Sequence, residues 1–155
     1  MNNTDLIQKF YTAFSHFNLD GMVSCYHEDV EFHDPAFGTL KGERAMAMWA
    51  MFMSRKEVIR EIRFSNVQAG AEMGSADWVA EYVYGPKKRK VVNRVHAEFR
   101  FQDGKIIHHS DRFDLWKWSR QALGPVGYLL GWSSFLQRKI QAETNRRLDA
   151  SIEKT

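Results

Sequence analysis

Residues 78–115 read WVAEYVYGPKKRKVVNRVHAEFRFQDGKIIHHSDRFDL, a stretch in which side chains of different character alternate with a period of two. That period is typical of β-strands, whose successive side chains point to opposite faces of a sheet. The alternation is broken at Gly85-Pro86, which a basic run follows, and at Asp103-Gly104, and both breaks are turn signals. The stretch therefore predicts a meander of long antiparallel strands joined by tight turns.

Upstream of this meander the apolar residues follow a helical spacing. Three segments show it, at residues 5–17, 19–26 and 42–52. Residues 30–34 alternate as a strand does and stop at Pro35, and a further strand begins near residue 58. Downstream, residues 117–155 return to helical patterns that Gly124-Pro125 interrupts.

This order of elements predicts an α+β fold, in which a curved antiparallel sheet packs on three N-terminal helices. Residues 1–116 would form that domain. Residues 117–155 would form a C-terminal helical extension, packed on the domain or on a dimer partner. A chain of 155 residues is long enough for one domain with its own core.

Composition excludes several classes of protein. Apolar residues make up 44% and charged residues 26%, which fits neither a disordered nor a fibrous chain. The lone Cys25 cannot form an internal disulfide, and the sequence shows neither a leader nor a long apolar run, so we expect a cytoplasmic protein. The net charge of +3 is spread over several segments, so we expect no nucleic-acid partner.

Two motifs resemble a known family. Residues 26–38, YHEDVEFHDPAFG, are similar to the segment between the second helix and the first strand of ketosteroid isomerases and SnoaL-like polyketide cyclases. Residues 103–114, DGKIIHHSDRFD, resemble the last hairpin of SnoaL-like proteins and limonene epoxide hydrolases. The resemblance covers about residues 4–116 and implies the cone-shaped fold of the nuclear transport factor 2-like superfamily, with an apolar pocket and a homodimer. The motifs point to the fold more than to a reaction.

The resemblance also implies where a catalytic site would lie. Asp34 matches the carboxylate with which ketosteroid isomerases remove a proton next to a carbonyl, and Asp111 matches an acid/base aspartate of limonene epoxide hydrolases. His109 shares the strand face of Asp111 and could share its proton or orient a water. We expect the substrate-binding residues to be Tyr11, Phe32, Trp49, Trp78, Tyr82, Asn93 and Phe113.

The chain departs from both enzymes. The oxyanion-holding tyrosine of the isomerase corresponds to Phe10, and its second oxyanion acid corresponds to Ala97. The arginine and aspartate that complete the epoxide hydrolase site fall near Trp78 and Ala80. Steroid isomerisation and limonene epoxide hydrolysis are therefore both disfavoured.

Burial among aromatic side chains would raise the pKa of Asp34 toward the working pH of a general base, and a second carboxylate nearby would separate the two pKa values further. Each residue also has a structural interpretation. Asp34 could only cap the turn at Pro35, Asp111 could pair with Arg94 or Arg112, and His109 could be a satisfied core histidine. Ligand spacing for a metal is lacking in the sequence, and we expect neither a metal nor a cofactor.

The apolar segment at residues 124–136 has three interpretations: a lid on the pocket, a dimer interface or a membrane-surface contact. We expect packing within the protein or the dimer, and no membrane contact, because the segment is short and broken by glycines.

Two functions remain open from the sequence. The first is a cofactor-independent acid/base enzyme, of isomerase, cyclase or hydrolase type, that acts on a small apolar molecule bearing a carbonyl, hydroxyl or epoxide. The second is a non-catalytic ligand-binding or protein-interaction domain of the same fold.

Overall fold

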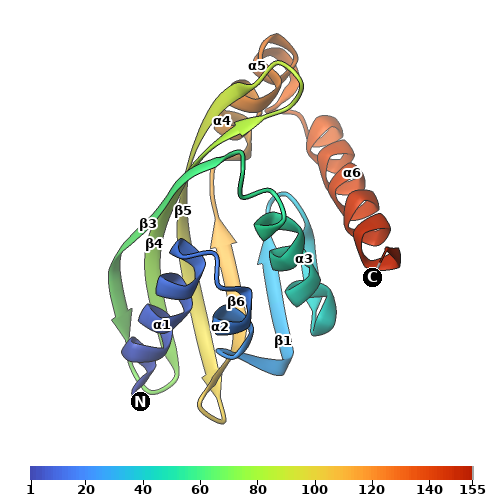
Figure 1. The fold of residues 1–155 in the computed structure, drawn as a ribbon. Helices are drawn as coiled ribbons and strands as arrows, with labels where there is room; N and C mark the ends of the chain where they lie inside the picture. The colour runs from blue at the N-terminus through green and yellow to red at the C-terminus, as the bar shows by residue number, and fades with distance from the viewer. Residues whose placement is uncertain (155) are drawn as a thin grey trace.

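The computed structural model describes residues 1–154, and its centre is one curved, unclosed sheet of six strands in the order β2-β1-β6-β5-β4-β3 (Figure 1). The strands are β1 Tyr26–Asp34, β2 Gly38–Lys41, β3 Ile59–Ala69, β4 Met73–Tyr84, β5 Arg89–Gln102 and β6 Lys105–Arg112. The helices are α1 Asn3–Ser15, α2 Leu19–Val23, α3 Glu43–Met53, α4 Leu115–Leu123, α5 Pro125–Leu130 and α6 Ser134–Glu153. The predicted α+β class, with three helices before a strand meander, is confirmed.

The antiparallel meander follows the alternation of the sequence. β4 pairs with β5 from Met73↔Arg100 to Tyr84↔Arg89, and β5 pairs with β6. Asp103 and Gly104 both have positive φ, 55° and 72°. That is the conformation a two-residue hairpin turn requires, and it explains the Asp-Gly pair.

One strand pair was not predicted. β1 and β6 run parallel, with Phe32 opposite His109 and His33 opposite Ser110. The sheet is therefore mixed, although its other pairs are antiparallel. This pair brings the strand that ends at Asp34 beside the strand that contains Asp111.

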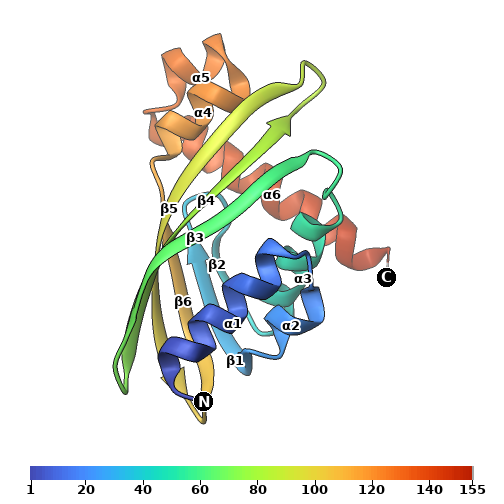
Figure 2. The ribbon, with the colours of Figure 1, turned by 60° about the vertical axis from the view of Figure 1, so that its left-hand side comes forward.

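Helices α1, α2 and α3 all lie on one face of the sheet (Figure 2). Between them and the sheet lies an aromatic core, to which α1 contributes Ile7, Phe10 and Phe14, all fully buried. The side chain of Asn2 accepts a hydrogen bond from the backbone N–H of Asp5, so the helix begins slightly earlier than its sequence signal suggested. The burial of this apolar stripe is what holds α1 on the sheet.

The C-terminal extension packs on the domain at both of its ends. α4 lies against β5, where the Gln121 side chain accepts a hydrogen bond from the backbone N–H of Val92 and donates one to its carbonyl. α6 returns to the loop between β1 and β2. Among residues 1–154, no helix is long and apolar enough to cross a bilayer.

Candidate functional site

A cavity of about 200 Å³ opens between the sheet, α3 and the C-terminal helices. Its wall is mainly apolar and aromatic. Its polar residues include Asp34, Arg55, Tyr82, Asn93, Asp111, Thr144 and Arg147. The apolar part includes Met48, Trp49, Phe52, Trp78, Phe113 and Trp118.

Asp34 ends β1 and is only 8% exposed. Its Oδ1 accepts a hydrogen bond of 2.6 Å from the backbone N–H of Phe37, so the carboxylate does close the turn after Pro35. It also lines the cavity. Burial raises the pKa of Asp34 from its ordinary value of 3.8 to about 7; the Phe37 N–H opposes this rise and the charge of Asp111 adds to it.

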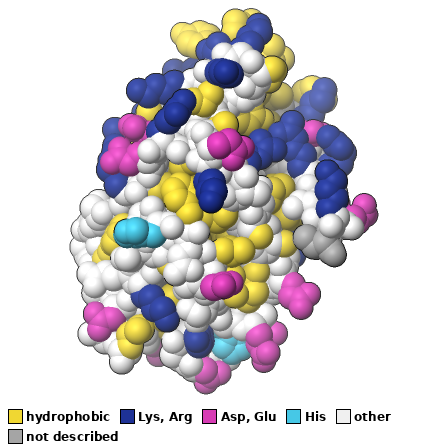
Figure 3. All heavy atoms as spheres, in the orientation of Figure 1, with side chains coloured by type: hydrophobic (Ala, Val, Ile, Leu, Met, Phe, Trp, Pro, Cys, Tyr) yellow, Lys and Arg dark blue, Asp and Glu magenta, His cyan; other side chains and the backbone are white. Residues whose placement is uncertain are grey.

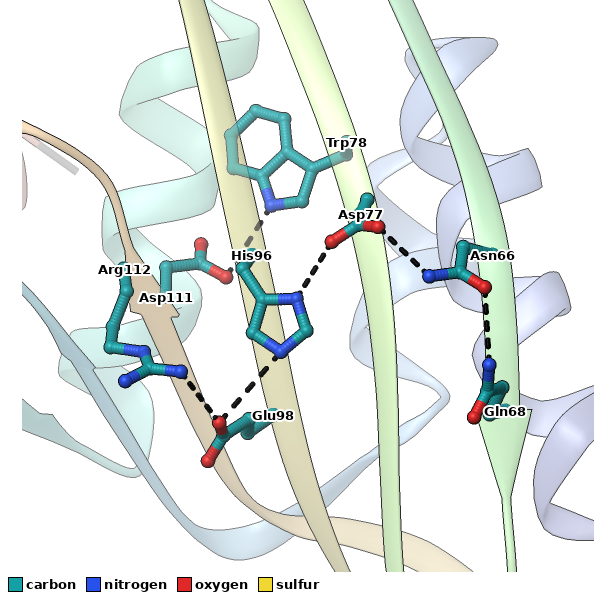
Figure 4. A network of polar contacts seen from close by, with 8 residues as sticks. All are labelled: Asn66, Gln68, Asp77, Trp78, His96, Glu98, Asp111 and Arg112. Atoms are coloured by element: carbon teal, nitrogen blue, oxygen red, sulfur yellow. Dashed lines mark hydrogen bonds and ion pairs between the residues drawn. The ribbon is translucent and has the colours of Figure 1, made fainter.

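Asp111 lies on β6, is buried, and faces the same cavity. Its Oδ1 accepts hydrogen bonds from the Nε2 of His109 at 2.8 Å and from the Nε1 of Trp78 at 3.4 Å. Figure 4 shows the indole of Trp78 pointing toward this carboxylate. These two contacts fix the orientation of the Asp111 side chain at the cavity wall.

The parallel register explains why the two carboxylates meet at one cavity. Phe32 lies opposite His109, and Asp34 and Asp111 each follow two residues later on neighbouring strands. Residues two apart on a strand share a face, and neighbouring strands lie about 4.8 Å apart. Both carboxylates therefore face the same cavity from adjacent strands.

His109 lies behind Asp111, in the core rather than at the cavity wall. Its Nδ1 is 2.7 Å from the hydroxyl of Tyr26, and that hydroxyl accepts a hydrogen bond of 2.9 Å from the Nε1 of Trp49. A carboxylate only accepts, so the Nε2 of His109 carries the hydrogen in its contact with Asp111. In that tautomer the Nδ1 of His109 accepts the hydrogen of the Tyr26 hydroxyl.

Tyr82 is a further polar group of the cavity wall. Its hydroxyl accepts a hydrogen bond of 2.6 Å from the Nε1 of Trp118 on α4. Burial raises the pKa of Tyr82 to about 12, so the phenol remains neutral and can donate its hydrogen. Asn93 also lines the cavity, where its amide could bind a ligand oxygen.

The predicted substrate-binding residues divide into two groups. Trp49, Trp78, Tyr82, Asn93 and Phe113 line the cavity. Tyr11 and Phe32 do not: both are fully buried, Tyr11 stacks on Phe64 and Phe32 packs edge-on against Trp49. Strand parity placed Phe32 on the correct face of the sheet but could not show that it lies deeper in the core.

The structural interpretations of the three candidate residues are also resolved. Arg112 pairs with Glu98 on the outer face of the sheet, not with Asp111 (Figure 4). His109 is a satisfied core histidine, yet one of its hydrogen bonds reaches the cavity wall through Asp111. Within residues 1–154, no group of three His, Cys, Asp or Glu side chains is arranged to hold a metal ion.

Sequence reasoning missed the contribution of α6. Thr144 and Arg147 line the cavity, and three polar side chains of α6 bond the backbone of the turn that carries Asp34. Gln141 donates to the carbonyl of Pro35, Thr144 to that of Ala36 and Asn145 to that of Phe37, at 2.9, 2.6 and 2.8 Å. These residues occupy polar positions of a charged helix, and no local signal separates them from solvent-facing ones.

A curved sheet with helices on one face and a cavity between them is the arrangement of the nuclear transport factor 2-like folds. The model of the SnoaL-like domain matches residues 7–109, and the chain belongs to this family. The predicted family is thereby confirmed. A comparison with curated proteins found no match.

Solved structures show the same fold. A protein with a ketosteroid isomerase-like fold from Catenulispora acidiphila, solved with trimethylamine, is 14% identical, with a TM-score of 0.63 over 83% of this chain and 96% of that one. An LEH-like epoxide hydrolase of M. tuberculosis is 18% identical, with a TM-score of 0.61 over 84% and 96%. An NTF2-like protein of unknown function from Burkholderia pseudomallei is 20% identical, with a TM-score of 0.57 over 74% and 92%. The TM-scores establish the shared fold, and identities this low leave the reaction open.

Proposed function

We propose that this protein is an enzyme that uses the Asp34–Asp111 pair for acid/base catalysis on a small apolar molecule bearing a carbonyl, hydroxyl or epoxide oxygen. The observation that supports the proposal is the burial of two carboxylates at one apolar cavity, one of them with its pKa raised to about 7. A group that titrates near the working pH is the most effective proton carrier. A buried pair with separated roles is the arrangement that acid/base enzymes use.

The contacts of each residue support distinct roles. Asp34, whose pKa lies near 7, would take a proton from the substrate and return it. The charge of Asp111 adds to the raised pKa of Asp34, and hydrogen bonds from His109 and Trp78 hold the Asp111 side chain at the cavity wall. Tyr82 would donate its hydrogen to the substrate oxygen. His109 would act as a positioning residue, since it reaches the cavity only through Asp111.

The volume of the cavity favours a small substrate. Ligand pockets for drug-sized molecules measure roughly 300–1,000 Å³, and this one measures about 200 Å³. Its walls of Trp49, Phe52 and Phe113 offer flat apolar surfaces to the body of the molecule.

A second candidate is a non-catalytic ligand-binding domain that works in the cytoplasm with the same cavity. The observation that favours it is the position of Phe10 and Ala97, where the isomerase keeps its oxyanion groups: both are fully buried in the apolar core. Tyr82 would have to replace those groups in an enzyme.

The test is a thermal-shift screen of small apolar carbonyl, hydroxyl and epoxide compounds, followed by turnover assays on every compound that binds. Asp34→Asn should lower kcat by about a hundredfold or more while binding persists. Asp77→Asn, a substitution on the outer face of the sheet, is the matched control and should leave kcat unchanged. Ligands that bind without turnover, or full activity in Asp34→Asn, would instead establish the binding domain or remove Asp34 from the mechanism.

A further inference from the structure

The C-terminal extension exposes a cluster of large apolar side chains. Between residues 126 and 135, six such side chains are 47–67% exposed: Val126, Tyr128, Leu129, Leu130, Trp132 and Phe135. We call residues 126–135 the apolar tip. The segment was expected to pack within the protein or a dimer; in the single chain α5 packs on α4, but these six side chains stay exposed. Side chains of this size are seldom left uncovered in one contiguous group.

The tip projects from the end of the molecule, away from the body of the sheet. Figure 1 shows α5 at one end of the molecule, beside the hairpin between β4 and β5. Two contacts fix α5 on α4: the Nε1 of Trp116 donates to the carbonyl of Tyr128, and Gly127 packs so closely on Ser119 that a Cβ there would lie 1.9 Å from its carbonyl oxygen. These contacts hold the tip in a defined position on α4.

The sequence on either side of the tip is basic. Residues 115–142 include four basic residues and no Asp or Glu, and the hairpin at residues 85–90 adds Lys87, Lys88, Arg89 and Lys90. Arg120 lies 4.4 Å from the ring of Trp116, and Lys139 lies 5.9 Å from that of Phe135. Figure 3 shows the result, with hydrophobic side chains at the top of the molecule and Lys and Arg side chains directly beside them.

This combination limits what can cover the tip. If a second copy docked through the same surface, the basic residues beside the tip of one copy would face those of the other. Their like charges would repel. The cavity does not need the tip as a lid, because none of residues 126–135 lines it. Aromatic and leucine side chains ringed by Lys and Arg instead match the interface of an anionic bilayer.

We propose that the apolar tip docks this protein on the surface of membranes that contain anionic lipids. Leu129, Trp132 and Phe135 insert between the lipid headgroups, and Arg120, Arg138 and Lys139 contact the phosphates. The inference does not depend on the proposed catalytic function.

The experiment is co-sedimentation of the full chain with phosphatidylcholine vesicles and with vesicles that contain 30% phosphatidylglycerol. The protein should sediment with the anionic vesicles, and far less with the neutral ones. Arg138→Gln with Lys139→Gln should weaken binding by more than tenfold, since each basic residue near the surface contributes about fivefold. Raising the salt concentration should weaken it too.

Matched variants separate docking from misfolding. Leu129→Gln with Phe135→Gln should abolish sedimentation, whereas Met73→Gln, at a side chain 54% exposed on β4, should not affect it. Circular dichroism should be the same for all. Absence of wild-type binding to anionic vesicles would overturn the proposal, and so would unchanged binding by the Leu129→Gln/Phe135→Gln variant. Conversion of a wild-type dimer to a monomer by that pair, without vesicle binding, would assign the tip to a second copy instead.

Discussion

Asp34 combines two properties that usually exclude each other, a turn-closing hydrogen bond and burial at a cavity wall. The turn alone would lower the pKa of a carboxylate, because the Phe37 N–H favours the charged form. Burial outweighs that bond and raises the pKa to about 7. The residue is therefore folded into a position where its charge costs stability.

This cost predicts how stability depends on pH. Between about pH 4 and 7 the native protein holds a proton on Asp34 that the unfolded chain has lost, so stability falls as the pH rises through this window. Asp34→Asn removes the titration while its side-chain oxygen can still accept from Phe37. The free energy of unfolding of the variant relative to wild type should therefore increase by about 3 kcal/mol between pH 4.5 and pH 8. Urea denaturation at the two pH values measures it, and an equal difference at both would contradict a raised pKa.

Replacing Tyr26 should lower the free energy of unfolding for a different reason, because it breaks a buried chain of hydrogen bonds. Tyr26→Phe leaves the Nε1 of Trp49 and the Nδ1 of His109 without their present partner. Buried polar groups that lose a partner destabilise by about 1–3 kcal/mol each, so we expect a loss of about 3 kcal/mol in urea unfolding. Tyr128→Phe, at a side chain 62% exposed, is the control and should change little. A small effect of Tyr26→Phe would mean that His109 is not held by this chain.

At the scale of elements, α6 connects the extension to the site. Its side chains bond three successive carbonyls, those of Pro35, Ala36 and Phe37, in the turn that closes over Asp34. The family match covers residues 7–109, so this helix lies outside it. The extension thus shapes a site in which Asp34 lies within the matched residues and Asp111 follows two residues after them.

Loosening this contact should change the pKa of Asp34. In the double variant Gln141→Ala/Thr144→Val, two carbonyls of the turn lose their partners and water gains access to Asp34. Because burial is the main cause of the raised pKa, the value should fall from about 7 toward 3.8. Titration of the carboxyl carbon by NMR measures it. Arg146→Ala, which removes only an exposed pair with Glu143, is the control and should leave the pKa of Asp34 where it is.

The elements also show what can be predicted from sequence. Alternation predicted β4, β5 and β6, and with them the face of Asp111, because side-chain parity is a local property. It did not predict β2, which is four residues long, or the parallel pairing of β1 with β6, because that pairing joins residues about 75 positions apart. The same limit applies to depth: parity put His109 and Phe32 on the inner face and could not show that they lie behind the cavity wall.

At the scale of the whole molecule, the two faces of the sheet have different surroundings. Helices α1 to α3 cover the inner face, while the outer face of β3 to β6 carries a polar chain that runs from Gln68 through Asn66, Asp77, His96 and Glu98 to Arg112 (Figure 4). Charges of both signs lie side by side on this face. A surface of that kind can be self-complementary in a two-fold dimer, in contrast to the basic residues beside the apolar tip.

The homodimer expected from the family should therefore form through the outer face. Glu98→Arg removes the acceptor of Arg112 at 3.0 Å and adds a cation beside it, and in a two-fold dimer the repulsion occurs twice. Size exclusion with light scattering should give a dimer for wild type and a monomer for this variant, with unchanged circular dichroism because residue 98 is exposed. The pair Leu129→Gln/Phe135→Gln should remain dimeric, since the tip would face lipid rather than protein. A monomeric wild type, or a dimer that survives Glu98→Arg and dissociates with the tip variant, would place the interface elsewhere.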